Sequence, residues 1–437
     1  MQGKKLVRRL EKGVPRVGVI GLGYVGLPLA LEFVRGGCRV TGIDTDTAKV
    51  RRINAGRSTV VDVADREVRE ARQSGRFEVS ADYRDLARCD GISIAVPTPL
   101  RKSRDPDISY IQGAVEKLVP LLTKGQVIVL ESTTYPGTTR EIIVPAVEAA
   151  GFKVGRDIFV AFSPERVDPG NKVWKIRNTP KVVGGATPAC TLAAAALYRR
   201  AVDQVVTVGS SDEAEMVKML ENTFRAVNIG LVNELMLMCD RMDINIWNVV
   251  NAAKTKPFGF MPFYPGPGIG GHCIPLDPVY LAWKAKMFSH YNRFIELATD
   301  INGNMPRFVV NRTARMLSRR SRKALNGAKI LVLGLAYKPD VDDLRESPGL
   351  EILKLLELEG AHVSYSDPHI PEFSEGDRTL KSVPLTPARL KGFDAAVLVT
   401  AHRKFNYPLL VRNLKLILDC RGAIGALLPK VKTVEAL

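Results

Sequence analysis

The chain has 437 residues, of which 46% are apolar and 25% charged, a composition typical of a globular protein with two or three domains. It contains no uncharged apolar run of roughly 18 residues or more, so we expect no membrane span, and its basic N-terminus lacks the apolar core of a secretory signal. The formal net charge is +17, but lysine and arginine are spread along the chain rather than gathered into a tail. We therefore expect a cytoplasmic protein that binds small anions and has no nucleic-acid partner.

Cysteines and histidines are both scattered along the sequence. The six cysteines form no C-x-x-C pair, which argues against a zinc site and against a disulfide framework. The histidines are His272, His290, His362, His369 and His402. Because they show no metal-ligand spacing, we predict that the protein holds no metal.

The first half of the chain alternates short β-branched runs with helix-like segments. This pattern, from Arg16 to about Val208, is typical of a parallel sheet with crossover helices. The expected strands are Val17–Ile20, Val40–Ile43, Ile92–Val96, Val127–Glu131 and Ile158–Phe162.

A glycine motif, G-L-G-Y-V-G, follows the first of these strands and opens a predicted helix. Its glycines Gly21, Gly23 and Gly26 would let a pyrophosphate approach the backbone at the helix N-terminus. Asp44 closes the next strand, where a carboxylate accepts hydrogen bonds from ribose hydroxyls and repels the 2′-phosphate of NADP. The unit therefore predicts an NAD site. The alternative is a glycine-rich turn that binds nothing.

Two hydroxyl-bearing loops follow later strands of the same sheet. They contain V-P-T-P, with Thr98, and E-S-T-T-Y-P-G, with Thr133. Ligands of open α/β sheets lie at the carboxyl ends of the strands, so we expect both threonines to face the nicotinamide half of the cofactor. Taken alone, each loop would be an ordinary turn.

The second half begins with a long helix and ends with another β/α pattern. From Asp212 to about Met242 the apolar residues recur at helical spacing, which predicts one long, largely buried helix. A helix-rich stretch with a glycine- and proline-rich loop, residues 257–278, extends to about Leu325. The expected strands beyond it are Lys329–Leu333, Ala361–Ser366 and Ala395–Val399.

These segments predict an α/β protein with two Rossmann-like, doubly wound domains joined by a long central helix and a helical domain. The expected domains are an NAD-binding domain at 13–208, a central helical domain at 209–325 and a C-terminal domain at 326–437. The long apolar helix has more surface to bury than a hinge would cover, so we expect a homodimer or a larger homo-oligomer.

Over nearly its whole length the sequence resembles the UDP-glucose/GDP-mannose dehydrogenase family. The motifs that carry the resemblance are G-V-I-G-L-G-Y-V-G-L-P from Gly18, V-P-T-P from Val96, E-S-T-T-Y-P-G from Glu131, F-S-P-E-R from Phe162, E-x-x-K-x-x-x-N from Glu215, P-G-P-G-I-G-G-H-C-I-P-L-D-P from Pro265 and G-L-A-Y-K-P-D-V-D-D-L-R-E-S from Gly334. The resemblance implies an NAD-dependent enzyme that oxidises the C6 alcohol of a UDP-sugar to a carboxylate. It also implies a central dimer-forming helix and a C-terminal domain that binds the UDP-sugar.

The resemblance makes Cys273 the nucleophile of this reaction. A thiolate at this position would trap the C6 aldehyde as a thiohemiacetal, and a second hydride transfer would give a thioester for water to hydrolyse. The glycines before Cys273 would let a substrate come close, whereas the other five cysteines stand in ordinary apolar or helical contexts. The alternative is a small buried apolar residue.

Lys218 and Asn222 are four residues apart and therefore share one helix face. By resemblance they bind the substrate and stabilise the C6 alkoxide and the tetrahedral intermediates. Spacing alone would favour a surface ion pair between Glu215 and Lys218.

The remaining site residues also come from the resemblance. Asp277 would work with a water in proton removal, and Glu165 in thioester hydrolysis. Gly270 and Lys338 would contact the substrate, and Arg345 the NAD. Loop caps and surface charges are the alternatives for these residues. The segment after Glu165, residues 166–170, departs from the family pattern, so Asp168 has no assigned role.

The surroundings of Cys273 bear on the sugar. Leu276 stands where UDP-glucose members usually carry lysine, so the sequence looks more like members that act on UDP-N-acetylhexosamines, especially UDP-N-acetylglucosamine. UDP-glucose and UDP-N-acetylmannosamine remain alternatives. Two other classes are a two-electron dehydrogenase of the β-hydroxyacid type, which needs no cysteine, and a non-catalytic NAD-binding sensor.

Overall fold

The computed structural model describes residues 2–60, 62–99, 101, 105–168, 171, 173–271, 273–428 and 431–437. The chain forms two compact units, each with its own sheet. The first contains Met1–Glu221 and Val279–Ser289, and the second contains Asn222–Pro278 and His290–Leu437. The three-domain division expected from the sequence stays a prediction.

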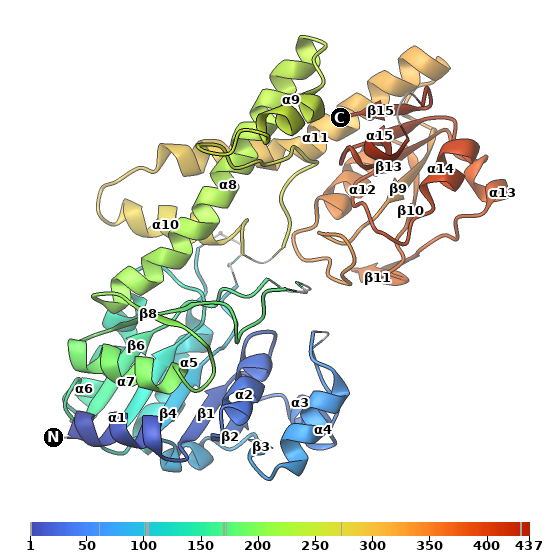
Figure 1. Ribbon diagram of the computed structural model, residues 1–437. Coiled ribbons are helices and arrows are strands. Elements are labelled where there is room, and N and C mark those ends of the chain that lie inside the picture. Colours follow the sequence, from blue (N-terminus) through green and yellow to red (C-terminus); the bar gives the residue numbers. More distant parts are fainter. Residues whose placement is uncertain are drawn as a thin grey trace. The chain divides into compact units, whose positions relative to one another are not determined.

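The first unit is built on an eight-stranded sheet with the order β3-β2-β1-β4-β5-β6-β7-β8 (Figure 1). Its strands are β1 (Arg16–Ile20), β2 (Arg39–Ile43), β3 (Phe77–Ser80), β4 (Gly91–Ile94), β5 (Gln126–Leu130), β6 (Ile158–Phe162), β7 (Lys181–Gly185) and β8 (Val205–Thr207). The first six are parallel, and β7 runs antiparallel to β6. The five strands expected in this region are all present. They are apolar along their length because helices cover the sheet on both faces.

Two apolar cores sandwich this sheet. One contains side chains of α1 (Gln2–Lys12), α2 (Gly26–Arg35) and α7 (Pro188–Tyr198), and the other those of α5 (Ser109–Leu118) and α6 (Val144–Ala149). The remaining helical segments are α3 (Thr47–Asn54), α4 (Asp65–Gln73), η1 (Tyr83–Arg88), η2 (Val119–Leu121) and η3 (Thr139–Ile143). This is the doubly wound arrangement that the sequence predicts.

The second unit contains a five-stranded parallel sheet with the order β10-β9-β13-β14-β15. Its strands are β9 (Lys329–Leu333), β10 (His362–Ser366), β13 (Ala395–Leu398), β14 (Ile417–Asp419) and β15 (Val434–Ala436), and a separate hairpin consists of β11 (Glu372–Glu375) and β12 (Arg378–Lys381). The helices near it are α11 (Arg293–Ser321), α12 (Pro348–Leu358), α13 (Pro387–Leu390), α14 (Tyr407–Asn413) and α15 (Ala423–Leu427). Side chains of α11 and α12 pack in the core on one face of the sheet, and those of α14 and α15 in the core on the other. The second doubly wound sheet is therefore also confirmed.

The same turn occurs at the start of both sheets. Gly21 follows β1 with a φ of +89°, and Gly334 follows β9 with a φ of +84°. In each case an aspartate after the neighbouring strand, Asp44 or Asp367, accepts a hydrogen bond from the N–H of the next residue, at 2.9 and 2.7 Å respectively. The two sheets thus share the same glycine turn with its aspartate acceptor, although their sequences differ.

The long helix is α8 (Ser211–Arg241), which is followed by α9 (Ile246–Ala253) and α10 (Asp277–Lys286). Its extent agrees with the prediction, but the expectation that its apolar stripe is largely buried is wrong for the single chain. The exposed members of that stripe are Met216, Leu220, Phe224, Leu231, Leu235 and Met238. The apolar side chains that α8 buries are others: Ala214, Met219, Ala226, Val232, Met236 and Cys239. The helix is apolar on two sides, and periodicity alone does not tell which side a single chain covers.

Among the described residues, no helix combines the length and the apolar character needed to cross a membrane.

Candidate functional site

The glycine turn after β1 has the shape of a phosphate cradle. A Cβ on Gly21 would lie 2.4 Å from the Ala95 carbonyl oxygen, and one on Gly26 would lie 1.8 Å from the Gly21 carbonyl oxygen. A Cβ on Gly23 would meet nothing within 4 Å. Gly21 and Gly26 are therefore required by the fold itself, whereas Gly23 leaves open space at the N-terminus of α2. That space fits the close approach of a pyrophosphate.

This difference between the glycines gives a testable prediction. Gly23→Ala should leave the thermal stability of the free protein nearly unchanged, because the added methyl group meets no atom of the chain. It should weaken NAD binding by about tenfold or more, because the methyl group occupies the approach of the pyrophosphate. Isothermal titration with NAD and thermal unfolding measure the two effects. Gly26→Ala is the matched comparison and should lower the melting temperature; equal NAD affinity in Gly23→Ala and wild type would contradict the assignment.

Asp44 is held rigidly at the carboxyl end of β2. It is 7% exposed and accepts hydrogen bonds from the backbone N–H groups of Leu22 and Asp46, at 2.9 and 3.0 Å. The Lys49 ammonium lies 2.9 Å from the same carboxylate. A carboxylate has about four acceptor positions, so these three donors leave room for a ribose hydroxyl. Lys49 was not singled out from the sequence; its place in the first turn of α3 was the available signal.

Thr98 and Thr133 lie on loops that follow the neighbouring parallel strands β4 and β5. The loops are joined by a hydrogen bond from Ser132 Oγ to the Val96 carbonyl oxygen at 2.8 Å. In the strand order, β1 and β4 are adjacent and their connections leave in opposite directions, which is where open α/β sheets bind ligands. The position agrees with the expected role, and the contact with nicotinamide itself stays a prediction.

The first unit brings Lys218 and Glu165 together. Lys218 is 5% exposed, and its Nζ donates a hydrogen bond to the Glu165 carbonyl oxygen at 3.0 Å. The Glu165 side chain turns back on its own loop, where Oε1 accepts from the N–H groups of Arg166 and Val167 at 2.8 and 2.6 Å. Two residues 53 positions apart therefore form one polar group.

A surface pair between Glu215 and Lys218, the alternative that spacing allowed, is wrong. Glu215 is fully buried and accepts from the N–H of Gly137 at 2.5 Å and from the N–H and hydroxyl of Thr139 at 2.9 and 2.7 Å. Burial raises the pKa of Glu215 to about 7, against the opposing effect of these donors. A raised carboxyl pKa favours folding at low pH, so this contribution is present below about 4.5 and lost as the pH rises through about 7.

Cys273 differs from the other five cysteines, all of which the structure describes. It is half-buried, whereas Cys38, Cys89, Cys190, Cys239 and Cys420 are buried. Burial raises the pKa of the Cys38 thiol to about 11 and that of Cys89 to about 12, which keeps both protonated and unreactive. Accessibility thus singles out Cys273 as the candidate nucleophile.

The segment after Cys273 forms a tight turn into α10. The Cys273 carbonyl oxygen accepts from the N–H groups of Leu276 and Asp277, at 3.0 and 2.8 Å. Asp277 is 1% exposed, and Asn222 Nδ2 donates to its carboxylate at 2.5 Å. The second unit therefore brings Cys273, Asp277 and Asn222 into one neighbourhood.

The glycines before Cys273 pack against the loop that follows β9. A Cβ on Gly270 would lie 2.7 Å from Tyr337 Cβ, and Gly271, with a φ of +90°, donates its N–H to the Arg345 carbonyl oxygen at 2.9 Å. Lys338 lies on the same loop, between these two contacts in sequence. Gly270, Lys338 and Arg345, predicted separately, thus belong to one pair of packed loops. Arg345 also pairs with Asp343 at 2.6 Å.

Arg421 is a candidate that the sequence analysis missed. It follows β14, and its Nε donates to the Val399 carbonyl oxygen at 2.7 Å. Its Nη1 would lie 2.6 Å from a Cβ on Gly266 in the glycine loop, and no carboxylate of the described residues pairs with its guanidinium. Burial lowers its pKa, but an arginine stays charged. A half-buried guanidinium beside a glycine loop suits an anionic ligand; the only sequence signal was its place just after a strand.

The fold brings His369 and His402 together, with ring centroids 5.1 Å apart, so the expectation that the histidines are scattered is wrong for this pair. Asp340 lies beside them. His402 is fully buried; its Nδ1 accepts from the Asp340 N–H at 3.0 Å and its Nε2 lies 2.9 Å from Asp367 Oδ2. Both ring nitrogens are engaged, so the geometry does not favour a metal here, and the absence of a metal stays a prediction. His272 lies outside the described residues.

The His402–Asp367 contact also distinguishes the two sheets. Asp367 occupies the position that Asp44 has in the first sheet, but it is 3% exposed and bonded to a fully buried imidazole. Its two oxygens also accept from four backbone N–H groups, so its acceptor positions are already occupied. The second sheet is therefore not a second dinucleotide site of the same kind.

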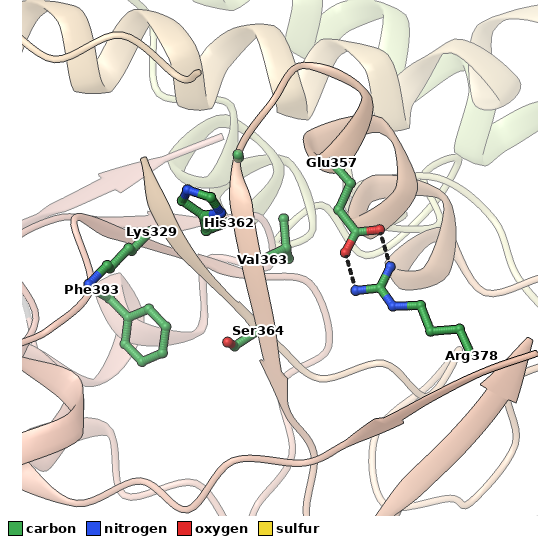
Figure 2. A pocket seen from close by; sticks show the side chains of 8 residues that line it. Lys329, Glu357, His362, Val363, Ser364, Arg378 and Phe393 are labelled. Carbon is green, nitrogen blue, oxygen red and sulfur yellow. Dashed lines mark hydrogen bonds and ion pairs between the residues drawn. The ribbon is translucent and has the colours of Figure 1, made fainter. Parts of the chain in front are cut away.

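One cavity of about 370 Å³ lies at the amino ends of strands β9 and β10 in the second sheet (Figure 2). Lys329 and His362, the first residues of β9 and β10, line it. Glu357 and Arg378 also line it and pair with each other through two hydrogen bonds, at 2.8 and 2.7 Å, as Figure 2 shows. Parallel sheets bind ligands at the carboxyl ends of their strands, so this cavity is not the candidate site.

Comparison with known proteins agrees with this geometry. Three family models match the chain: the NAD-binding domain of the UDP-glucose/GDP-mannose dehydrogenase family at residues 15–202, its central domain at 212–304 and its UDP-binding domain at 331–426. A UDP-N-acetyl-D-glucosamine 6-dehydrogenase of Pseudomonas aeruginosa is 34% identical over 89% of this chain and 91% of its own length. A UDP-N-acetyl-D-mannosamine dehydrogenase of Yersinia pestis is 34% identical over 89% and 94%.

The similarity extends to three dimensions. The solved structure of a UDP-D-ManNAc dehydrogenase from Pyrococcus horikoshii superposes with a TM-score of 0.87 at 32% identity, covering 96% of this chain and 98% of that one. The chain therefore belongs to the UDP-glucose/GDP-mannose dehydrogenase family of NAD-dependent oxidoreductases.

Proposed function

We propose that the protein oxidises the C6 alcohol of a UDP-N-acetylhexosamine, UDP-N-acetylglucosamine first, to the uronate through a thioester on Cys273. The observation that carries the proposal is the exposure of Cys273, the one accessible thiol among six described cysteines, in a glycine loop near the Asn222–Asp277 pair. The relatives named above act on UDP-N-acetylhexosamines according to their names. That the cysteines are unpaired also suits the reducing conditions of the cytoplasm, where we place the reaction.

In this mechanism Cys273 binds the substrate covalently between the two oxidation steps. Bound NAD supplies the hydride acceptor for both oxidations. After the first, the Cys273 thiolate adds to C6 of the aldehyde and forms a thiohemiacetal; after the second, C6 is a thioester carbon. Water then attacks C6, the C–S bond breaks, and the thiolate returns.

The polar groups have complementary roles in the proposal. Lys218 and Asn222, one turn apart on α8, donate hydrogen bonds to the C6 oxygen as negative charge develops on it. Asp277 takes up protons through a water, and Glu165 removes a proton from the hydrolytic water. Donors fixed by a long helix need little reorganisation, which is the main requirement for this kind of stabilisation.

Substrate binding is assigned to the packed loops of the second unit. Lys338 and Arg421 carry the positive charge that a UDP diphosphate requires, and Gly270 allows close approach of the backbone. The sugar preference rests on the sequence around Cys273 and on the relatives, which include both N-acetylglucosamine and N-acetylmannosamine enzymes.

The experiment that tests the function measures NADH formed per molecule of sugar consumed. UDP-N-acetylglucosamine, UDP-N-acetylmannosamine and UDP-glucose are each supplied as the limiting substrate with excess NAD. We expect two NADH per sugar, with UDP-N-acetylglucosamine preferred. One NADH per sugar would indicate a two-electron dehydrogenase of the β-hydroxyacid type, and preference for another of the three sugars would correct the substrate. NAD binding without turnover of any of them would favour a sensor.

We also propose that the exposed stripe of α8 is the interface of a homodimer. Its large apolar residues lie along one side of a 31-residue helix, a continuous surface that monomers seldom leave in water. A twofold contact between two such helices would bury the stripe on both chains.

The double substitution Leu220→Ser and Phe224→Ser tests this interface. These side chains are 61% and 47% exposed in the single chain, so their replacement should not disturb its core, but it should convert dimers into monomers at micromolar concentration. Light scattering coupled to gel filtration gives the mass. Leu358→Ser on α12, a residue 81% exposed, is the matched control and should leave the dimer intact. A wild-type protein that is monomeric under these conditions would refute the interface.

A further inference from the structure

A buried ion-pair network connects Glu165 to Lys181 and Glu131, and the mechanism above assigns no role to the latter two residues. Its centre is Lys181, the first residue of β7, whose side chain is 5% exposed. The Lys181 Nζ lies 2.6 Å from Glu131 Oε2 and 3.6 Å from Glu165 Oε2. One ammonium group therefore faces two carboxylates.

Glu131, on the far side of Lys181, is fixed in place. Its side chain has no exposed surface. Its Oε1 accepts hydrogen bonds from the Ser93 hydroxyl at 2.8 Å and from the Tyr198 hydroxyl. Burial raises the pKa of Tyr198 far above its usual range, so that hydroxyl remains a donor. Glu131, which directly follows β5, thus anchors Lys181 through contacts that reach β4 and α7.

Glu165, on the near side, has one oxygen engaged and one available. Oε1 accepts from two backbone N–H groups, whereas Oε2 is buried and has no hydrogen-bond partner among the described residues. The cation that lies near Oε2 is the Lys181 ammonium, at 3.6 Å. Oε2 is therefore the oxygen of Glu165 that can receive a proton, and Lys181 stands beside it.

The charge balance of the network explains why the lysine matters. Burial acts to lower the pKa of Lys181, but the charges of Glu131 and Glu165 outweigh burial and raise it, so the side chain stays an ammonium. Arg166 turns away from this network, toward the Pro180 carbonyl oxygen and Glu221. Lys218 contacts the main chain of Glu165 rather than its carboxylate. Without Lys181 the two carboxylates would face each other in a buried region with no cation between them.

We propose that Lys181 is a positioning residue for hydrolysis of the thioester, acting through Glu165. It holds the Glu165 carboxylate in place, with Oε1 on the backbone N–H groups of its own loop and Oε2 beside the ammonium. In the step it supports, the oxygen of water bonds to C6, a water proton passes to Glu165 Oε2, and the C6–S bond breaks to release the Cys273 thiolate. Lys181 touches neither substrate nor cofactor in this step. The inference rests on the role of Glu165 in the proposed function.

The test compares Lys181→Met with Lys181→Arg, using Lys124→Met as control. Lys124 has a side chain that is 58% exposed and pairs with Asp157, so its loss removes the same charge outside the network. Each protein is mixed with excess NAD and UDP-N-acetylglucosamine. NADH is followed in the first turnover and at steady state, and the acyl adduct on Cys273 is measured by intact mass.

For Lys181→Met we expect a burst of NADH at nearly the wild-type rate, followed by a steady-state rate at least about tenfold lower. The acyl adduct should accumulate, because formation of the thioester is intact and its hydrolysis is slow. Lys181→Arg should restore much of the steady-state rate, and Lys124→Met should match the wild type. Should Lys181→Met fail to fold, the double variant Lys181→Met with Glu131→Gln removes both members of the tight pair and should show the same adduct.

Glu165→Gln separates failure of this inference from failure of the function. If Glu165→Gln accumulates the adduct and the folded Lys181 variants do not, Lys181 serves only the core of the domain and the inference is overturned. If Glu165→Gln accumulates no adduct while turnover continues, the hydrolytic role of Glu165 itself is wrong. If the adduct accumulates in Glu165→Gln and in Lys181→Met, but not in Lys124→Met, Lys181 acts through Glu165.

Discussion

Cys273→Ser is expected to stop the release of free uronate while NAD still binds. A serine hydroxyl is a much weaker nucleophile toward the C6 aldehyde than a thiolate, and an oxygen ester would hydrolyse without the good leaving group that the thioester provides. We expect acid formation to fall by about a thousandfold or more, the scale on which removal of a covalent nucleophile acts. Mass spectrometry of the product, with UDP-N-acetylglucosamine and excess NAD, measures the acid directly.

The control for this substitution is another cysteine of the same chain. Cys38→Ala removes a buried thiol of the first unit and should cost some stability but no acid formation. Affinity for NAD should be unchanged in both variants, because neither cysteine belongs to the glycine turn or to the Asp44 carboxylate that are assigned to NAD. Full carboxylate production by Cys273→Ser would remove the thioester from the mechanism.

Much of the fold could be predicted because each strand has a recognisable local sequence pattern. Parallel strands covered on both faces are continuous β-branched runs, so their positions were visible from Val17–Ile20 to Ala395–Val399. The helix α1 was missed because its signal is only Leu6 and Leu10, four apart in a basic segment. Both leucines are buried, and side chains of α1 and α7 share one core. Such a short amphipathic helix is recognised by what it packs on, which the sequence does not show.

The candidate site was predictable where one motif contains the geometry. Gly21, Gly23 and Asp44 lie within one β-α-β unit, and Cys273 and Asp277 within one turn, so their neighbours in space are also neighbours in sequence. Residues that are far apart in sequence and brought together only by the fold could not be predicted in this way. Lys181 reaches Glu131 across 50 positions, and His402 reaches Asp367 across 35. Nothing local distinguishes these side chains from ordinary surface charges.

The orientation of α8 could not be predicted from the sequence either. The apolar spacing was correctly recognised as helical, but the stripe it marks is the exposed one. The covered side contains Ala214 and Ala226 together with Met219, Val232 and Met236, so both sides of the helix carry apolar residues at helical spacing. A helix with two apolar sides fits the homodimer proposed above, in which one side packs in the chain's own core and the other against the partner.

Lys218→Met should lower turnover by about a hundredfold or more, the usual cost of removing one preorganised donor from a developing oxyanion. Methionine keeps most of the volume of the buried stem, so the α8 packing should persist, and the melting temperature is expected to change little. The affinity for NAD should stay the same, because Lys218 is not part of the glycine turn after β1. The loss should therefore appear in kcat for both NADH-forming steps, not only in the final hydrolysis.

This pattern separates Lys218 from Lys181, although both lie beside Glu165. Lys218 donates to the main chain of Glu165 and is proposed to serve the C6 oxygen throughout the reaction, so Lys218→Met should slow the first turnover and accumulate no adduct. Lys181→Met should leave the first turnover fast. Stopped-flow measurement of the NADH burst in the two variants, with Lys124→Met as the common control, distinguishes the roles. An unimpaired Lys218→Met enzyme would show that the buried ammonium merely supports the Glu165 loop, and the alkoxide would then need another donor, with Asn222 the nearest candidate on α8.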